Sequence, residues 1–491
     1  MGNNYKRILD SVHGYIKIRK SLFKDIIDTP NFQRLRHIEQ TSSRSIFPSA
    51  RHDRFIHSLG VFHLGHKIIE AIEQTNESKH FPKKEMVYNT FRAACLLHDV
   101  GHAPFSHTFE QFYDNDYNRL NELLKEEINN QEFTEDVDKY FQDSAPHEIM
   151  SAYILTKIYS KIAHKYNVNI ELAVRMIIGC LYHKEANSHS LENAFIQLIH
   201  GNVIDADGLD YVCRDSWASG YSTARVDIDR LIESIRIVVD TDQQYQVCYT
   251  PKSLNEIEAV LSVKTFQQAN VITHHTVVYE QQLLIKAMES AALYHFDIQD
   301  TENEIAREVA LNRLCNIKTM YETIILPKHQ IPFSLPMDDD FISLMKYIPE
   351  DKYVKQWFSR QYDLVPLWKS KADFYNLFPI FIEAKITKEN WLFSDDCKLF
   401  IAQILNIQKN DIWILDAQDK YKGNHASTIN LLVNGEIKPY LSLFPNDKNS
   451  YVPDIQPFFY IYIPKKHQGE KDEIIKRLRE EVNKYIFNRI K

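Results

Sequence analysis

The sequence predicts a mainly α protein, with an all-helical core over residues 1–315 and a smaller α+β region over residues 316–491. Apolar residues recur at three- and four-residue spacings along most of the first 310 residues, which is the period of an amphipathic helix. Glycine is scarce, at 12 of 491 residues, so folds that need many tight glycine turns are disfavoured. Strand and hairpin patterns begin only after about residue 320.

Helical periodicity is clear in several segments of the first region. Between residues 58 and 72, Leu59, Phe62, Ile68 and Ile72 fall on one helical face. The same spacing predicts helices over residues 58–72, 88–98, 148–166, 169–183, 226–238 and 253–295.

The second region combines turn, strand and helix patterns. Prolines that precede a run of aspartates predict a surface connection, at Pro327, Pro332, Pro336 and Asp338 to Asp340. Strands are expected over residues 412–415, 428–433, 436–444 and 458–463. Asn434-Gly435 favours a two-residue hairpin turn, because both turn positions need a positive φ. The last twenty residues predict a helix with one apolar face, formed by Ile475, Leu478, Val482, Tyr485 and Ile486.

Composition excludes several classes of protein. The net charge of −8 gives no general affinity for nucleic acid, so nucleic-acid binding is not indicated. The six cysteines contain no C-x-x-C pair, which excludes a zinc ribbon and gives no disulfide framework. No apolar run approaches the ~18 residues of a membrane span. We therefore expect a cytoplasmic protein without a membrane partner.

Histidine is unevenly distributed along the chain. Fifteen of the 21 histidines fall in the first 200 residues. This excess suggests that the first region uses imidazole for metal binding or proton transfer.

One segment has the character of a metal site. His98-Asp99 follows an apolar helix that Gly101 and Pro104 should stop, so two polar side chains would stand at a helix end. An imidazole beside a carboxylate suits a divalent metal, but further ligands must come from elsewhere. The candidates are His57 upstream and four carboxylates downstream, Asp205, Asp207, Asp210 and Asp215.

The spacing alone leaves two interpretations open. The downstream carboxylates could hold a metal, or they could form a solvated helix face on which Arg214 pairs locally. A second His-Asp pair, His52-Asp53, lies in a polar stretch and is interpreted as a chance occurrence.

Four longer motifs carry a family resemblance. They are residues 28–36 (DTPNFQRLR), 54–61 (RFIHSLGV), 97–107 (LHDVGHAPFSH) and 207–215 (DGLDYVCRD). In this order they resemble the HD-domain phosphohydrolases, and most closely the deoxynucleoside triphosphate (dNTP) triphosphohydrolases, which include bacterial dGTPases and the SAM-and-HD-domain dNTPase. The resemblance covers roughly residues 5–300, so we expect an HD-domain core and no SAM domain.

The resemblance implies a metal site and a proton donor. His57, His98, Asp99 and Asp207 would hold one divalent ion, which could be Mn, Fe, Mg or Zn, and further Mg could arrive with the nucleotide. Attack at the α-phosphate would release a deoxynucleoside and triphosphate. His107, oriented by Glu110, would protonate the leaving oxygen. His102 and His147 match positions near the phosphates.

The resemblance also implies substrate and activator contacts. Arg54 matches a phosphate-binding arginine, Tyr211 a tyrosine packed on the deoxyribose, and Gln40 a sugar or base contact. The remaining substrate candidates are Asp215, Lys264 and His275. An activating guanine nucleotide would be bound between subunits by Lys6, Asp28, Gln33 and Arg36, although Gln33 and Arg36 could equally belong to an exposed helix face.

Two departures from the family pattern affect the substrate. Gly208 stands where the SAM-and-HD-domain enzyme has a lysine. Lys264 stands where that enzyme has an arginine, and a lysine lacks the bidentate grip of a guanidinium.

Three functions follow from these observations. The first is a metal-dependent dNTP triphosphohydrolase, activated by nucleotide and assembled as a homo-oligomer with a tetramer favoured, acting in dNTP balance or antiphage nucleotide depletion. The second is an HD phosphohydrolase or phosphodiesterase on another nucleotide or on single-stranded nucleic acid. The third is a nucleotide-sensing protein with a weak HD site. P-loop chemistry is unsupported, because the chain has no G-x-x-x-x-G-K-[ST] motif.

Overall fold

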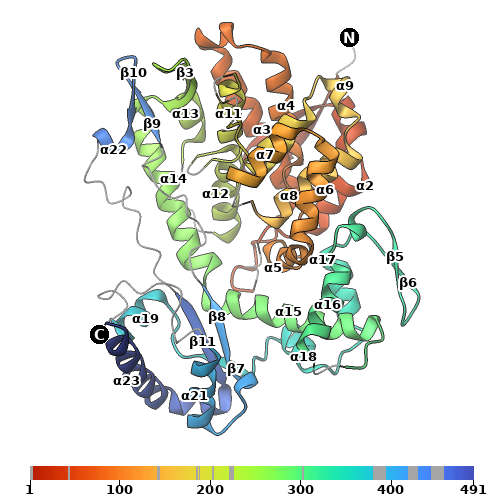
Figure 1. The fold of residues 1–491 in the computed structure, drawn as a ribbon, viewed down its shortest axis with the longest axis vertical. Helices are drawn as coiled ribbons and strands as arrows, with labels where there is room; N and C mark the ends of the chain where they lie inside the picture. Colours follow the sequence, from red (N-terminus) through yellow and green to blue (C-terminus); the bar gives the residue numbers. More distant parts are fainter. Residues whose placement is uncertain are drawn as a thin grey trace. The chain divides into compact units, whose positions relative to one another are not determined.

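The structure is a computed structural model of the full chain (Figure 1). It describes residues 4–41, 45–140, 144–183, 186, 188–201, 204–220, 226–300, 303–379, 394–417, 429–443 and 458–490, without the side chains of 114–118 and 485–490. The predicted contribution of Tyr485 and Ile486 to the last helix face therefore lies outside the described side chains. Two compact units can be distinguished: residues 1–264, 288–347 and 423–450 form the first, and residues 265–287, 348–422 and 451–491 the second.

Helices make up most of the first unit, so the predicted mainly α fold is confirmed. Those that frame the site are α3 (Arg54–Glu73), α4 (Lys84–Leu97), α5 (His107–Glu110), α8 (Pro146–Ile158) and α12 (Ala206–Ser219). The others are α1 (Lys20–Leu22), α2 (Pro30–Gln33), α6 (Tyr117–Ile128), α7 (Gln131–Tyr140), α9 (Ile162–Tyr166), α10 (Ile170–Ile178), α11 (Ser190–Gln197), α13 (Ile228–Glu233), α14 (Leu254–Gln267), α16 (Glu304–Leu314), α17 (Asp338–Met345) and α22 (Tyr440–Leu443).

The first unit also contains strands that helical periodicity did not predict. β1 (Tyr5–Asp10) and β2 (Gly14–Arg19) form an antiparallel hairpin. Residues 226–238 were expected to be one helix, but α13 ends at Glu233 and the chain continues as β3 (Ile235–Val239), paired with β4 (Tyr245–Tyr249). The run of Ile and Val in β3 fits a half-buried strand as well as a helix, and the pairing with β4 decides between them.

The predicted hairpin at Asn434-Gly435 is present. It joins β9 (Asn430–Val433) to β10 (Glu436–Pro439), and both turn residues have positive φ, 54° and 82°. Strand β9 adds in parallel to β4 through Tyr249 and Leu431, giving a sheet of order β10-β9-β4-β3. The predicted strand over 436–444 is shorter than expected, because α22 begins at Tyr440.

The predicted surface connection at 327–340 is only partly correct. β5 (Ile324–Leu326) and β6 (Ile331–Phe333) form a hairpin that leaves Pro327 and Pro332 exposed. Asp338, however, is 6% exposed, and its carboxylate accepts the N–H groups of Phe105 at 2.6 Å and Glu39 at 3.0 Å. The aspartate run thus begins as an internal support rather than as a solvated loop.

The expected long helix over 253–295 is interrupted. α14 ends at Gln267, residues Gln268–Ile272 form a π-helical turn, and α15 (His275–His295) follows. No helix among the described residues is long and apolar enough to cross a membrane.

The second unit is built on a three-stranded antiparallel sheet. Its order is β7 (Leu364–Pro366), β11 (Phe459–Pro464), β8 (Trp413–Asp416). Its core includes Trp368, Phe374 and Phe459, and its helices include α18 (Lys352–Ser359), α19 (Lys371–Leu377), α21 (Asp395–Leu405) and α23 (Lys471–Ile490). The strands expected at 412–415 and 458–463 and the final helix are therefore confirmed within one or two residues.

Candidate metal centre and second histidine cluster

The start of α3 fixes the first two polar side chains of the site. Asp53 caps the helix, its carboxylate accepting the N–H of Ile56 at 2.9 Å, and the first turn then carries Arg54 and His57. The neighbouring His52 bonds Asp215 at 2.6 Å. His52 and Asp53 thus both make structural contacts, and the side chain of His52 is buried rather than exposed in a polar stretch.

The end of α4 delivers the next pair. The helix stops at Leu97, so His98 and Asp99 stand at its carboxyl end, as the sequence predicted. The chain then turns at Gly101, where an added Cβ would lie 2.4 Å from the backbone nitrogen of Ser151. Glycine is required here because α8 packs directly against the turn.

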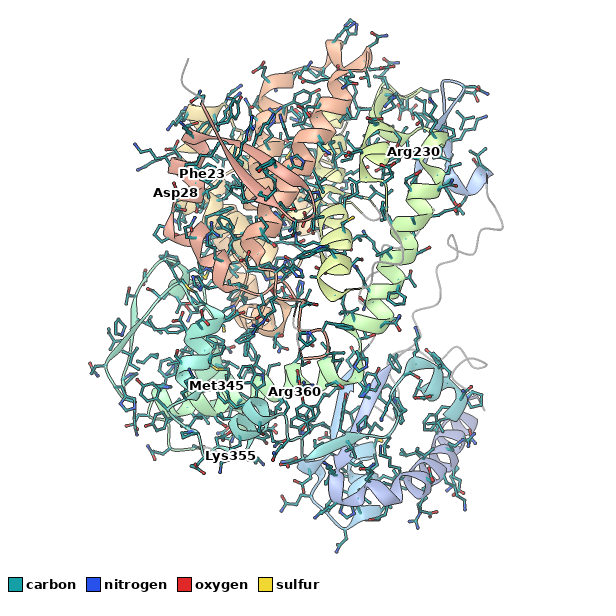
Figure 2. All side chains as sticks on the ribbon, turned by 180° about the vertical axis from the view of Figure 1, so that it is seen from behind. Phe23, Asp28, Arg230, Met345, Lys355 and Arg360 are labelled. Atoms are coloured by element: carbon teal, nitrogen blue, oxygen red, sulfur yellow. The ribbon has the colours of Figure 1, made fainter. Side chains whose placement is uncertain are left out.

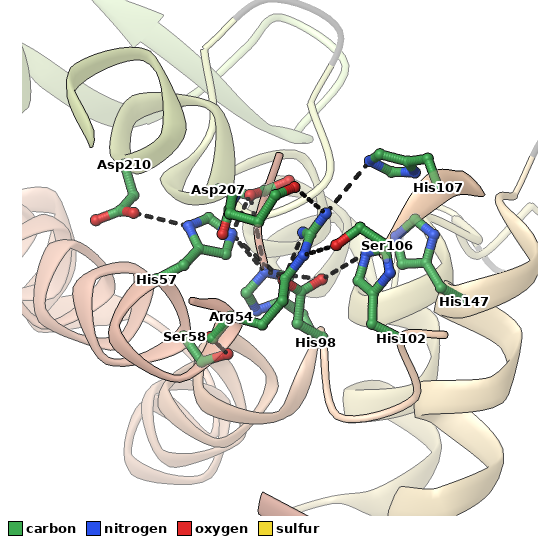
Figure 3. A network of polar contacts seen from close by, with 12 residues as sticks. Arg54, His57, Ser58, His98, His102, Ser106, His107, His147, Asp207 and Asp210 are labelled. Carbon is green, nitrogen blue, oxygen red and sulfur yellow. Dashed lines mark hydrogen bonds and ion pairs between the residues drawn. The ribbon is translucent and has the colours of Figure 1, made fainter. Parts of the chain in front are cut away.

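The start of α12 brings the fourth side chain. Asp205 caps α12 through the N–H of Gly208 at 2.5 Å, and Asp207 lies in the first turn. Asp205 is therefore held by the helix end, and Asp207 is the downstream carboxylate that faces the histidines (Figure 3).

Together these three helix ends form the metal-type cluster (Figure 3). Nε2 of His57 lies 3.3 Å from Nε2 of His98 and 3.0 Å from an Asp207 oxygen. Asp207 is 3.7 Å from His98 Nε2. Oδ2 of Asp99 lies 3.5 Å from His57 Nε2, and Oδ1 of Asp99 lies 3.5 Å from His98 Nε2. Two imidazole nitrogens and two carboxylates thus face one point, the donor set of a divalent-metal site.

A layer of contacts behind the cluster orients both histidines. Nδ1 of His57 donates to Asp210 at 2.7 Å, and Nδ1 of His98 donates to the carbonyl of Cys95 at 3.0 Å. Both rings therefore present Nε2 to the centre, the arrangement usual for metal-ligating histidines.

Asp210 is itself held from two sides. Arg214 donates two hydrogen bonds of 2.8 Å to it, and His13 contacts it at 2.6 Å. Space for this pair depends on Gly60, since a Cβ there would lie 1.9 Å from an Asp210 oxygen. Sequence reasoning named Asp210 only among the possible metal ligands, whereas the structure places it behind His57, where it orients the ring.

The charged groups of the cluster shift one another's pKa values. Burial alone would lower the pKa of His57, but hydrogen bonds to Asp207 and Asp210 outweigh it and raise that pKa to about 10. Burial would raise the pKa values of Asp207 and Asp210, yet their cationic partners hold both well below the usual range. In the absence of an ion, the carboxylates are therefore ionised and His57 carries a balancing proton at neutral pH.

A second histidine cluster lies beside the first. Glu110 accepts hydrogen bonds from Nδ1 of His107 at 2.8 Å and Nδ1 of His147 at 2.5 Å. His102 stacks on His147 with ring centroids 3.9 Å apart. His107 is the exposed member, with 57% of its side chain accessible. Burial opposes ionisation of Glu110, but the charges of His107 and His147 lower its pKa well below the usual value.

The loop before α5 is strained and internally supported. Phe105 and Ser106 have φ values of 53° and 52°, which disfavour residues with side chains. Asp338 holds the Phe105 N–H, and Arg34 donates to the carbonyls of Val100 and His102. These buried contacts set the position from which His107 extends.

Arg54 connects the two clusters. Its guanidinium donates to Asp99 at 2.8 Å and to Ser106 Oγ at 2.9 Å, and lies 3.4 Å from His107 Nε2 (Figure 3). Arg54 is thus placed between the metal-type cluster and the exposed imidazole, where the sequence predicted a phosphate contact.

Buried polar atoms without partners remain near this bridge. Among the described residues, neither ring nitrogen of the buried His102 has a hydrogen bond, although its Nε2 lies 3.6 Å from Asp99, and Oε1 of Gln40 also has none. A buried polar group without a partner costs free energy, so such atoms mark a place where a ligand can bind.

The other predicted substrate residues lie in different surroundings. Nζ of Lys264 is 5.5 Å from the Tyr211 ring centroid, and a Cβ on Gly208 would lie 2.9 Å from that Nζ. Lys264 therefore fills the space that a side chain at position 208 would need. His275 lies in the second unit, where its ring is 6.1 Å from that of Tyr460.

The predicted activator residues occur as two pairs. Lys6 lies 3.5 Å from Asp28 and over the Phe23 ring, and Figure 2 labels Asp28 and Phe23 side by side. Arg36 donates to Gln33 at 2.9 Å. Gln33 in turn donates to the carbonyl of Ile27, which places the two pairs next to each other.

Comparisons with known proteins agree with this fold and site. The HD domain family model matches residues 54–177, a range that holds His57, His98, Asp99 and His147. The chain is 31% identical over 273 residues to the deoxynucleoside triphosphate triphosphohydrolase SAMHD1 homolog of Dictyostelium discoideum, covering 55% of this chain and 46% of that protein. It is 27% identical over 310 residues to the deoxynucleoside triphosphate triphosphohydrolase SAMHD1 of Gallus gallus, covering 60% and 47%. The chain thus spans about half the length of these curated relatives.

A solved structure is similar over nearly the whole chain. A phosphohydrolase from Bacteroides thetaiotaomicron matches with a TM-score of 0.61 at 21% identity, covering 94% of this chain and all of that one. At this identity the likeness concerns the fold alone.

Residues 54–177 form an HD domain, in which His57 and His98 face Asp207 from α12, with Asp99 beside them. Within that class the chain is similar to the deoxynucleoside triphosphate triphosphohydrolases, which agrees with the resemblance noted in the sequence.

Proposed function

We propose that this protein is a metal-dependent dNTP triphosphohydrolase that releases a deoxynucleoside and triphosphate. The observation that carries the proposal is the adjacency of the two histidine clusters, with Arg54 3.4 Å from His107 on one side and 2.8 Å from Asp99 on the other. Such an arrangement offers a metal-type donor set, a cation for phosphate and a proton donor within one site.

The donor set fits a divalent ion. His57, His98, Asp99 and Asp207 would hold it, and the two carboxylates would balance its charge. A bound ion of this kind supplies Lewis-acid polarisation of a phosphoryl oxygen and lowers the pKa of a bound water. Mn, Fe, Mg and Zn all accept such ligands, and further Mg would accompany the nucleotide.

The second histidine cluster would handle the leaving group. Glu110 holds Nδ1 of His107, which leaves Nε2 of this exposed ring to carry a proton. On cleavage, that proton would pass to the 5′ oxygen of the departing deoxynucleoside. Glu110 and His147 would orient the ring, while His102, with unpaired nitrogens, would face phosphate oxygens.

The cationic side chains near the proposed substrate site support a triphosphate as the substrate. The lysine that the relatives carry after the last metal carboxylate is absent here, but Lys264 reaches over Gly208 from α14. Together Arg54 and Lys264 would neutralise part of the triphosphate charge. Gln40, Tyr211 and Asp215 complete the proposed substrate contacts in the first unit, with Tyr211 packing on the sugar.

Regulation is proposed at the Lys6–Asp28 and Gln33–Arg36 pairs. An aspartate and an arginine can read the edge of a guanine, so a guanine nucleotide would bind here between subunits of a homo-oligomer. The physiological role would be dNTP balance or depletion of nucleotides during phage infection.

The deciding experiment is a turnover panel of the four dNTPs, singly and in pairs, with Mn²⁺, Mg²⁺ or Fe²⁺. We expect tripolyphosphate and deoxynucleoside as products, and loss of all turnover in Asp207→Ala because the ion loses a ligand. The matched control is Asp229→Ala, which removes an exposed carboxylate on α13 that pairs with Lys67. Orthophosphate from nucleoside monophosphates with dNTPs untouched would instead favour the second function, and no turnover with less than one ion per chain would favour a sensor.

A further inference from the structure

A separate cavity of about 380 Å³ lies under the N-terminal hairpin. It is enclosed by β1 and β2, by α3 and α4, and by residues 162–168 at α9. None of the residues assigned above to the metal, to proton transfer, to substrate or to the activator lines it. Its volume falls within the range of small-molecule sites, roughly 300–1,000 Å³.

The floor of this cavity is apolar. Ile26, Phe62 and Leu96 line it and are all at least 94% buried. An apolar floor of this kind binds a flat, weakly hydrated body such as a nucleobase through area burial.

The walls of the cavity are cationic. Lys17, Arg19, Arg92 and Lys165 line it, and none of the described residues in its lining is an aspartate or glutamate. Tyr5 pairs with Arg19 in the hairpin, and Lys17 is two residues earlier, so these side chains share one face of β1–β2. A guanidinium fork at Arg19 or Arg92 suits a phosphate group.

Nearby acids neutralise only part of this charge. Asp25 bonds Lys165 and Tyr166, and Glu70 lies 3.4 Å from His66. Arg92 donates at 3.3 Å to His66 and to Asn89, both of them neutral acceptors. Among the described residues, neither Arg19 nor Arg92 has a carboxylate within ion-pair distance. Burial lowers the pKa of Arg92; the charge of Glu73 opposes this effect, that of Arg19 adds to it, and that of Glu70 opposes it again.

We propose that this cavity is a second nucleotide-binding site, which takes a nucleoside phosphate with its base on the Phe62–Leu96 floor and its phosphate between Arg19 and Arg92. It is distinct from the Lys6–Asp28 pair, because Lys6 and Tyr5 are successive strand residues and point to opposite faces of the hairpin. The amide of Asn167, which also lines the cavity, is available to the base edge.

The test is equilibrium dialysis of radiolabelled AMP against the full-length protein in EDTA, which removes the metal from the catalytic centre. We expect the double variant Arg19→Ala with Arg92→Ala to bind AMP at least tenfold more weakly. The matched control removes two exposed arginines elsewhere in the same unit, Arg230 and Arg313, of which Figure 2 labels Arg230, and should bind like the unchanged protein. Photolabelling with 8-azido-AMP should mark peptides that contain Tyr5 or Tyr166.

Three results would overturn the proposal. The first is equal AMP binding by the unchanged protein and the Arg19/Arg92 variant, and the second is a label that falls on other peptides. The third is competition by inorganic phosphate as strong as by AMP, since a base on the floor should add affinity. Lys17→Glu, at an exposed strand position, gives an independent readout should the double variant fail to fold, and it should weaken binding in the same direction. Because binding is measured without metal, failure here leaves the proposed hydrolase activity untouched.

Discussion

The two histidine clusters lie side by side but differ in how firmly their imidazole rings are held. In the metal-type cluster, both His57 and His98 have Nδ1 held by a buried acceptor, so each ring is fixed with Nε2 facing the centre. In the second cluster, His107 is 57% exposed and held by Glu110, with Arg54 3.4 Å from its Nε2, while neither ring nitrogen of His102 has a hydrogen bond to a described residue. The rings proposed to hold the ion are thus each fixed by a second contact, whereas the rings proposed to meet substrate keep ring nitrogens available.

The largest effect should come from removing the exposed imidazole of His107, which tests whether the two clusters have separate roles. His107→Ala should lower kcat by ~10²–10⁴-fold, the usual contribution of a general acid, while metal content stays at the level of the unchanged protein. The measurement is dNTP turnover together with metal analysis of the purified protein. Loss of the metal in this variant would show that the two clusters are one site.

A milder test concerns the layer behind His57. Asp210→Asn keeps the shape but weakens the hydrogen bond that orients the ring, so metal affinity should fall ~10–100-fold. Titration of the metal-free protein with Mn²⁺ would measure it, and added metal should restore most turnover. Glu233→Gln, at the exposed end of α13, is a control that changes a carboxylate outside the site. Unchanged affinity in Asp210→Asn would remove the distinction between fixed and unfixed rings.

The smallest effect concerns a pair behind the second cluster. His200 lies 3.3 Å from Glu148, next to His147 in the chain, and this charge overcomes burial and raises the pKa of His200 to about 9. Because the folded pKa is raised, the pair stabilises fully below ~6.5, the ordinary pKa of histidine, and the contribution is lost as pH rises through about 9.

Melting temperatures of the unchanged protein and of His200→Gln measure this contribution. Their difference should be largest near pH 6 and should shrink above pH 9. A difference that stays constant with pH would mean that His200 contributes through packing rather than charge.

Sequence patterns predicted the parts of this molecule that local rules determine. The end of α4 before His98-Asp99, the turn at Asn434-Gly435 and the final helix each follow from residues close in the chain. The mainly α class follows from the same periodicity. The β3 strand did not, because its Ile and Val residues satisfy either pattern until β4 pairs with them.

The contacts that complete the site come from residues far apart in sequence. Asp338 supports Phe105 across more than two hundred residues, and Asp210 orients His57 from a helix that no local spacing relates to α3. Lys264 filling the space over Gly208 is of the same kind. None of these three contacts can be predicted from residues close in the chain.

The Asp338 contact also bears on the order in which the chain can mature during synthesis. The loop that aims His107 is translated early, but the carboxylate that holds its Phe105 N–H emerges more than two hundred residues later. Strand β9, which extends the β3–β4 sheet, comes later still. A nascent chain that has completed only its HD motifs therefore lacks the carboxylate that supports the loop before His107.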